Sequence, residues 1–318
     1  MPRPLPARKP PARSSGRANA KADAPAALTE KTLAAWPPPE LGEHSDKEAR
    51  GQVLLVAGSY EMPGAALLAG VAALRTGAGK LTIAAPARIA QGLSFAIPEA
   101  RVISLVESPS GGLAARGIEA IGHLAARASS VVLGPGMVDE QRSKSFVARM
   151  LPLFCESPMV LDAYAMSAVI DAPFRQPVIL TPHAGEMAHL TGLPKEAIEE
   201  HPLEVAREAA ARWNAIVVMK GTVTFICRPD GTAWRFDGGS PGLGTSGSGD
   251  TLAGLIGGFL ARGMAPVEAC GWGVTVHGRA GEVLARRMGP LGYLARELPG
   301  EVPALIHQIQ TRPRTRRR

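Results

Sequence analysis

The sequence is poor in aromatic residues and in cysteines, and each scarcity excludes a class of structure. Phe, Trp and Tyr make up only 4% of the 318 residues, although hydrophobic residues reach 46%. The core must therefore consist mainly of Ala, Leu, Val and Gly, which favours helices packed on a parallel sheet over an antiparallel β-sandwich. The three cysteines, Cys155, Cys227 and Cys270, show no CxxC spacing. This excludes a disulfide framework and gives no indication of a structural zinc site.

Long apolar runs and several catalytic motifs are also missing. No apolar run approaches the roughly 18 residues that indicate a membrane-spanning helix, and the N-terminus lacks the apolar stretch of a secretory signal. No HExxH motif and no paired-carboxylate motif occurs, so metal-hydrolase and glycosidase chemistry have no support. We expect a cytoplasmic protein that supplies no metal ligands of its own.

The positive charge is concentrated in the two tails. Taking +5 for residues 1–27 and +5 for residues 312–318 from the net charge of +7 leaves −3 for the body of the chain. We therefore predict a disordered, basic, Pro-rich tail at 1–27, one domain at 28–311 and an Arg-rich tail at 312–318. A transit peptide is the alternative for the first tail, but five prolines in the first eleven residues oppose an amphipathic helix.

Short apolar segments alternate with segments of helical periodicity along most of the chain. This alternation predicts an α/β fold with a mostly parallel sheet and helices on both faces. The strands are expected at residues 52–58, 80–86, 101–106, 130–136, 159–163, 177–183 and 215–221. A short helix capped by Thr29 should precede them. A hairpin with its turn at 229–231 should follow, and after it a Gly-rich loop opening into a helix (238–263) and a long helix (266–287).

The Gly-rich loop is the strongest single motif. In Thr245-Ser246-Gly247-Ser248-Gly249-Asp250-Thr251, the glycines allow close backbone approach to an anion, and the helix that follows directs free N–H groups at it. Asp250 can be a general base beside this anion site. It can also be an ordinary favourable charge at a helix N-terminus, worth about 0.3–1 kcal/mol. The loop alone does not decide between the two.

Other strand ends carry polar residues as well. Lys220, at the end of an apolar strand and followed by Gly221, Thr222 and Thr224, is a candidate phosphate ligand, although a solvated lysine has the same pattern. His183 lies in a tight strand-to-helix turn, Thr-Pro-His-Ala-Gly-Glu. The GxGxxG pattern that begins at Gly242 follows a hairpin instead of a first βαβ strand, so it is weak evidence for a dinucleotide fold.

Six motifs in order resemble the ADP/ATP-dependent NAD(P)H-hydrate dehydratases, a branch of the ribokinase-like superfamily. They are VLLVAGSYEMPGAALLAGVAALRTGAGKLTIAAP, VVLGPGM, VLDAYAM, ILTPHAGEM, VVMKGTVT and GTSGSGDTLAGLIGGFLARG. The resemblance implies a ribokinase-like three-layer fold. It also implies ADP- or ATP-dependent dehydration of the (S)-hydrates NADHX and NADPHX to NADH and NADPH. Such enzymes phosphorylate the ring hydroxyl and then eliminate phosphate.

The resemblance also implies a role for each matching residue. Asp250 is expected to be the base and to contact the substrate, and an anion hole is expected at Gly247, Ser248 and Gly249. The nucleotide site would comprise Lys220, Gly221, Thr222, Val223, Thr224 and Gly249. The hydrate pocket would comprise Ala65, Gly136, His183 and Asp250. Mg²⁺ would bind through phosphate oxygens and water, with no protein ligand, and the protein would be a homo-oligomer, a tetramer by resemblance.

Three positions depart from the family pattern, and other functions remain open. Tyr164 replaces an acid, Ala184 a proline and Ser246 a glycine; the first change puts any role of that acid in doubt. A kinase for a thiazole or pyrimidine alcohol would share the Gly-rich loop and Asp250. A polyanion-binding protein acting through its basic tails and a non-catalytic nucleotide sensor are further alternatives.

Overall fold

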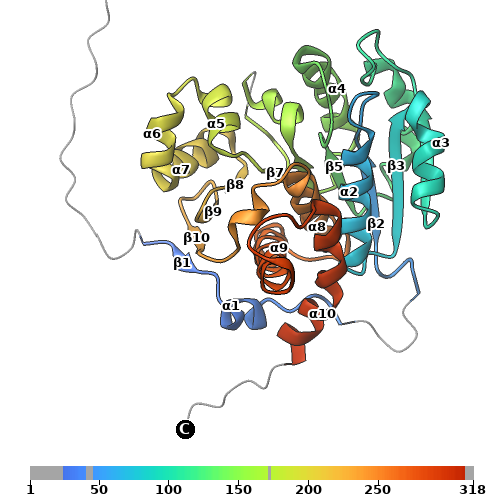
Figure 1. Cartoon of the computed structure of the whole chain (residues 1–318). Coiled ribbons are helices and arrows are strands. Elements are labelled where there is room, and N and C mark those ends of the chain that lie inside the picture. The colour runs from blue at the N-terminus through green and yellow to red at the C-terminus, as the bar shows by residue number, and fades with distance from the viewer. Residues whose placement is uncertain (1–23, 41–45, 171–172, 312–318) are drawn as a thin grey trace, which may run out of the picture.

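A computed structural model describes residues 24–40, 46–170 and 173–311 (Figure 1). Its centre is a ten-stranded sheet in the order β1-β10-β9-β8-β7-β6-β5-β2-β3-β4. The strands are β1 (Ala26–Ala27), β2 (Gln52–Val56), β3 (Lys80–Pro86), β4 (Ala100–Leu105), β5 (Ser130–Leu133), β6 (Met159–Leu161), β7 (Val178–Leu180), β8 (Ile216–Met219), β9 (Thr224–Cys227) and β10 (Ala233–Phe236). From β4 to β8 all neighbours are parallel, whereas β9 pairs antiparallel with both β8 and β10.

Helices lie on both faces of this sheet, as the alternation of segments predicts (Figure 1). They are α1 (Glu30–Ala35), α2 (Pro63–Arg75), α3 (Ala87–Ala96), α4 (Glu140–Leu153), α5 (Ala184–Thr191), α6 (Lys195–Glu200), α7 (Pro202–Trp213), α8 (Ser248–Ala261), α9 (Pro266–Met288) and α10 (Leu298–Thr311). Short 3-10 helices at Ala115–Ala120, Gly122–Leu124 and Ala163–Ile170 complete the second face. No helix in the described ranges is long and apolar enough to cross a membrane.

The sheet separates two hydrophobic cores, because successive side chains of a strand point to opposite faces. In β2, Val53 and Leu55 join the core formed with α2, α8 and α9, while Leu54 and Val56 join the core under α4 and α7. All four side chains are at most 1% exposed. Burial on both faces accounts for strands that read as continuous apolar segments without polar alternation.

Helices α2 and α8 approach each other unusually closely, and small residues make this possible. A Cβ placed on Gly254 of α8 would collide with the backbone carbonyl of Ala69, and one on Gly258 would lie 2.5 Å from the carbonyl oxygen of Ala73. These glycines therefore let α8 lie directly against α2. The contact fixes the axis of the helix whose first turn carries the Gly-rich loop.

The fold confirms the α/β class with a mostly parallel sheet and helices on both faces, the expected strands, the hairpin and the helix capped by Thr29. Residues 26–27, which we assigned to the basic tail, instead form β1 and pair in parallel with β10. A two-residue strand has no apolar pattern of its own, so only its distant partner defines it. The rest of the first tail, residues 1–23, and the Arg-rich tail at 312–318 lie outside the described residues.

Candidate active site

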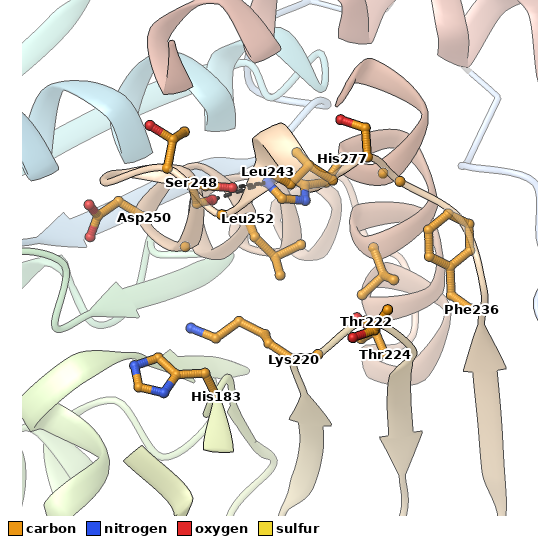
Figure 2. A pocket seen from close by; sticks show the side chains of 18 of the residues that line it. His183, Lys220, Thr222, Thr224, Phe236, Leu243, Ser248, Asp250, Leu252 and His277 are labelled. Carbon is orange, nitrogen blue, oxygen red and sulfur yellow. Dashed lines mark hydrogen bonds between the residues drawn. The ribbon is translucent and has the colours of Figure 1, made fainter. Parts of the chain in front are cut away.

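A cavity of about 1020 Å³ lies at the carboxyl ends of β6, β7 and β8, facing the first turn of α8 (Figure 2). Open α/β sheets bind ligands at this edge. Its lining residues include Asp162, His183, Glu186, Lys220, Thr222, Thr224, Phe236, Leu243, Ser248, Gly249, Asp250, Leu252, Val274 and His277. They come from segments far apart in the sequence, and the parallel strands bring them to one place.

Most of the predicted site residues line this cavity. They are His183, Lys220, Gly221, Thr222, Thr224, Gly247, Ser248, Gly249 and Asp250. Val223, Ala65 and Gly136 are not among its lining residues. Ala65 and Gly136 nevertheless lie together, because a Cβ on Gly136 would be 2.6 Å from the Cβ of Ala65. Their predicted contact with the hydrate stays a prediction.

Asp250 is the third residue of α8, after Gly247, whose φ of 87° favours glycine. Its carboxyl group has its pKa raised to about 7, chiefly because the group is desolvated by burial. The negative charges of Asp162 and Glu186 raise this pKa further, whereas Lys220 lowers it. A carboxylate with a pKa near 7 can accept and return a proton at neutral pH, as a general base requires.

Lys220 is held between two carboxylates. Its Nζ lies 3.6 Å from Oδ1 of Asp162 and 3.4 Å from Oε2 of Glu186. Burial opposes its charge, but these two carboxylates outweigh burial and raise the pKa of Lys220. The Nζ also lies beneath Gly249, since a Cβ placed there would be 3.2 Å away. The ammonium group is therefore fixed below the first turn of α8 (Figure 2).

His183 has a structural role that is visible in its hydrogen bonds. Its Nδ1 accepts from the N–H groups of Gly185 (2.9 Å) and Glu186 (3.2 Å) and caps the N-terminus of α5. In return, Glu186 Oε2 accepts from the His183 N–H at 2.8 Å, which completes a capping box. Because Nδ1 accepts, the ring proton of neutral His183 is on Nε2. The side chain still lines the cavity with its other edge.

At the first turn of α8, where the sequence predicts an anion site, one of the expected donors is already used. The Ser248 N–H donates to the carbonyl of Thr245 at 3.2 Å, and the Thr251 N–H donates to the carbonyl of Gly247 at 3.1 Å. Within the described residues, the N–H groups of Gly249 and Asp250 make no hydrogen bond. These two groups are therefore available to an anion, and so is the N–H of Gly247, which makes no hydrogen bond in that part of the chain either. The predicted anion hole at 247–249 stays a prediction, with the N–H of Ser248 already engaged.

Sequence reasoning missed three residues of the site: Asp162, Glu186 and His277. Asp162 is 3% exposed and its Oδ1 accepts from the hydroxyl of Thr181 at 2.6 Å. Asp162 and Glu186 stand inside two of the motifs that carry the resemblance. Acidic residues in such motifs could have been predicted as site residues from the sequence. His277 is a single histidine within an apolar helix, and no local pattern marks it.

One wall of the cavity is apolar. Phe236, Leu243 and Leu252 contribute to it, with Thr222 and Thr224 at its border (Figure 2). Val274 lines the cavity as well. Apolar walls with a few convergent polar groups are typical of small-molecule sites.

The carboxyl groups of the cavity suit a cation that takes most of its ligands from a bound molecule and few from the protein. In the described ranges, no group of three or more His, Cys, Asp or Glu side chains is arranged to hold a metal ion. Asp162, Glu186 and Asp250 nevertheless place three carboxyl groups around the single ammonium of Lys220. In charge, this excess of acidic groups is compatible with a divalent cation such as Mg²⁺, which in proteins usually keeps several water ligands.

A profile of the NAD(P)H-hydrate dehydratase family matches residues 53–304, which include every residue that lines the cavity. The chain belongs to the NAD(P)H-hydrate dehydratase family. The chain is 46% identical over 282 residues to the ADP-dependent (S)-NAD(P)H-hydrate dehydratase of Xanthomonas campestris, covering 89% of this chain and 96% of the relative. The enzyme of the same name from Bacillus subtilis is 35% identical over 272 residues, covering 86% of this chain and 95% of that enzyme.

A solved structure supports the same assignment. The ADP/ATP-dependent NAD(P)H-hydrate dehydratase of Bacillus subtilis, co-crystallised with ATP and Mg²⁺, matches with a TM-score of 0.77 and 32% identity. The match covers 89% of this chain and 98% of that structure. A hydroxyethylthiazole kinase from Pyrococcus horikoshii, at 18% identity and a TM-score of 0.57, shares the fold alone.

Proposed function

We propose that the protein dehydrates the (S)-hydrates NADHX and NADPHX to NADH and NADPH, with ADP or ATP as phosphoryl donor. The observation that carries the proposal is one cavity that joins a carboxyl group poised near neutral pH, free N–H groups and a fixed ammonium. The names of relatives that align over nearly their whole length support the same reaction.

The chemistry follows from the site. Hydroxide is a poor leaving group, so the hydroxyl must first become a phosphate ester. Asp250 accepts the proton of the ring hydroxyl, and the hydroxyl oxygen forms a bond to the terminal phosphorus of the nucleotide. At the same time the bond from this phosphorus to the bridging oxygen breaks, and the shortened nucleotide leaves. The N–H groups of Gly249 and Asp250 stabilise the charge on the transferred group. The ester then loses phosphate and a ring proton, which restores the reduced nicotinamide.

Lys220 and the segment up to Thr224 hold the phosphates of the nucleotide in this proposal. The ammonium lies beneath Gly249, where a Cβ would be 3.2 Å from Nζ, and so brings positive charge to the first turn of α8. Mg²⁺, when bound, would neutralise charge on the phosphate oxygens, and Asp162 and Glu186 are the residues that would hold it. The hydrate pocket is proposed to be lined by Ala65, Gly136 and His183, together with Asp250.

Incubation with enzymatically hydrated NADH and either ADP or ATP tests the function. We expect recovery of the absorbance of reduced nicotinamide together with one free phosphate for each hydrate consumed. A thiazole or pyrimidine kinase would instead release a stable phosphate ester and leave the hydrate untouched. Parallel runs with hydrated NADPH and both nucleotides determine which hydrate and which donor are preferred.

Two further properties belong to this proposal. We expect a homotetramer from the family resemblance, and a cytoplasmic location as the sequence analysis predicts. Light scattering of the purified protein measures its mass, and a monomer would contradict the first expectation. Fractionation of cells tests the second, and recovery with membranes or secreted material would contradict it.

A further inference from the structure

His277 has no role in the function proposed above, yet it joins α9 to the first turn of α8. Its Nε2 lies 3.0 Å from the Ser248 hydroxyl oxygen and 3.1 Å from the Ser248 carbonyl oxygen (Figure 2). Both residues line the cavity. We propose that His277 is a positioning residue that holds Ser248 so that the Ser248 hydroxyl donates to the transferred phosphoryl group. The proposal rests on the proposed function.

The tautomer of His277 follows from its two partners. A carbonyl oxygen can only accept, so the 3.1 Å contact requires a proton on Nε2. The hydroxyl oxygen at 3.0 Å then accepts from the same N–H. The proton of the Ser248 hydroxyl is not used by the histidine and is left for another acceptor.

The rest of Ser248 is fixed as well. The Ser248 N–H donates to the carbonyl of Thr245. Ser248 is the first residue of α8 and is only 5% exposed. The hydroxyl proton is therefore the one donor of Ser248 that remains for a ligand. It adds a further donor to the N–H groups of Gly249 and Asp250 at the same helix end.

His277 is neutral at physiological pH. Burial lowers its pKa to about 4, and the positive charge of Lys220 acts in the same direction, against the hydrogen bond with the Ser248 backbone. A neutral imidazole keeps its single Nε2 proton for Ser248 and adds no charge beside the phosphates. Its contribution is then orientation, which distinguishes it from Lys220.

A double-mutant cycle tests whether His277 acts through the Ser248 hydroxyl. Removal of one donor from an oxyanion site costs about 10²–10³-fold in kcat, so we expect His277→Leu and Ser248→Ala each to lower kcat by up to this factor. The affinity for ADP, measured by calorimetry, should change little. The double variant should be no slower than the slower single variant. Losses that multiply would overturn the proposal, because they would mean independent roles.

The conservative variant His277→Gln separates positioning from packing. Its side-chain amide can donate from about the same place as Nε2, so we expect it to recover most of the kcat that His277→Leu loses. A kcat as low as that of His277→Leu, at unchanged melting temperature, would contradict the proposal. Thr275→Val on the same helix is the matched control. Its buried hydroxyl has no hydrogen-bond partner in the part of the chain that the structure describes, and Thr275 does not line the cavity, so kcat should not change.

A direct measurement does not depend on turnover. Nitrogen-15 spectra of the full chain, with the His277 signals assigned by comparison with His277→Gln, should show the Nε2–H tautomer at neutral pH. A proton on Nδ1 would overturn the proposal, because Nε2 would then accept from the Ser248 hydroxyl. If the Nε2–H tautomer is found but no hydrate is consumed, the proposed function fails and the placement of Ser248 stands.

Discussion

At the scale of single residues, the site depends on the ionisation of one carboxyl group, that of Asp250. Asp250 shares the cavity with Asp162 and Glu186, and Lys220 is the cation placed among them. The pKa of Asp250 is about 7 because burial and the negative charges of Asp162 and Glu186 raise it more than the positive charge of Lys220 lowers it. Changing any of these neighbours should move the pH range in which the base is ionised.

We predict that kcat/KM falls with decreasing pH, with an apparent pKa near the value of about 7 for Asp250. Asp162→Asn removes a repulsion and should move this midpoint to lower pH. Lys220→Ala removes the attraction and should move it to higher pH, besides weakening nucleotide binding more than hydrate binding. Profiles of kcat/KM for the three proteins measure the shifts; movement of both variants in the same direction would contradict the electrostatic account.

The same carboxyl group should make the folded protein less stable at alkaline pH. Its folded pKa of about 7 lies above the ordinary value of 3.8. The folded state therefore favours the protonated form, and stability is lost as the pH rises through about 7. We predict that Asp250→Asn abolishes turnover yet has a higher melting temperature than the natural protein at about pH 8, with a difference that vanishes near pH 4. Thermal unfolding across pH measures it, and a lower melting temperature at alkaline pH would show that burial does not govern Asp250.

How far the sequence predicts these residues depends on the kind of pattern. Asp250, Lys220 and His183 stand at strand or helix ends in recognisable motifs, and the structure brings them to one cavity. Asp162 and Glu186 stand in the same motifs, but their contact with Lys220 depends on the pairing of β6, β7 and β8. His277 meets Ser248 only because α9 packs on α8, and nothing in the local sequence of α9 reports that contact.

At the scale of elements, the contact of α2 with α8 keeps the first turn of α8 in place. We predict that Gly254→Ala destabilises the protein by about 1–3 kcal/mol, because the added Cβ meets the carbonyl of Ala69 and the two helices must separate. Activity should fall as well, since α8 carries Asp250. Chemical denaturation and kcat measure the two effects.

Gly92→Ala is the matched control for this prediction. Gly92 is exposed within α3, and a Cβ there would meet nothing within 4 Å. Alanine should stabilise the helix by about 0.5–1 kcal/mol through its better helix propensity, with kcat unchanged. An equal loss of stability in both variants would show that the close approach of α2 and α8 is not the cause.

The sequence predicts the main elements well, because their signals are local. Continuous apolar segments indicate the buried strands, and the Pro-Asp-Gly turn at 229–231 indicates the hairpin of β9 and β10. The connections at 115–124 and 163–170 are 3-10 helices, a distinction that periodicity does not make. β1 is defined only by a partner that lies about two hundred residues further along the chain.

At the scale of the whole molecule, the positive charge and the site are in different parts of the chain. We predict that removal of residues 1–23 and 312–318 leaves kcat and KM unchanged and abolishes retention on an anionic column. The removed segments hold the whole positive excess, and the remainder carries −3. Kinetics and chromatography of the shortened protein test this, and a fall in kcat would mean that a tail contributes to the site.

The short strand β1 sets a limit on such shortening. Ala26 and Ala27 pair with Trp234 and Arg235 of β10, and the N–H of Leu28 donates to the Arg235 carbonyl at 2.8 Å. On its other side β10 pairs with β9, so β1 covers the outermost backbone of the sheet. A chain that begins after Leu28 would expose an unpaired strand edge, which is a template for pairing with another molecule. Such a protein would associate edge to edge at high concentration and aggregate even with an intact cavity.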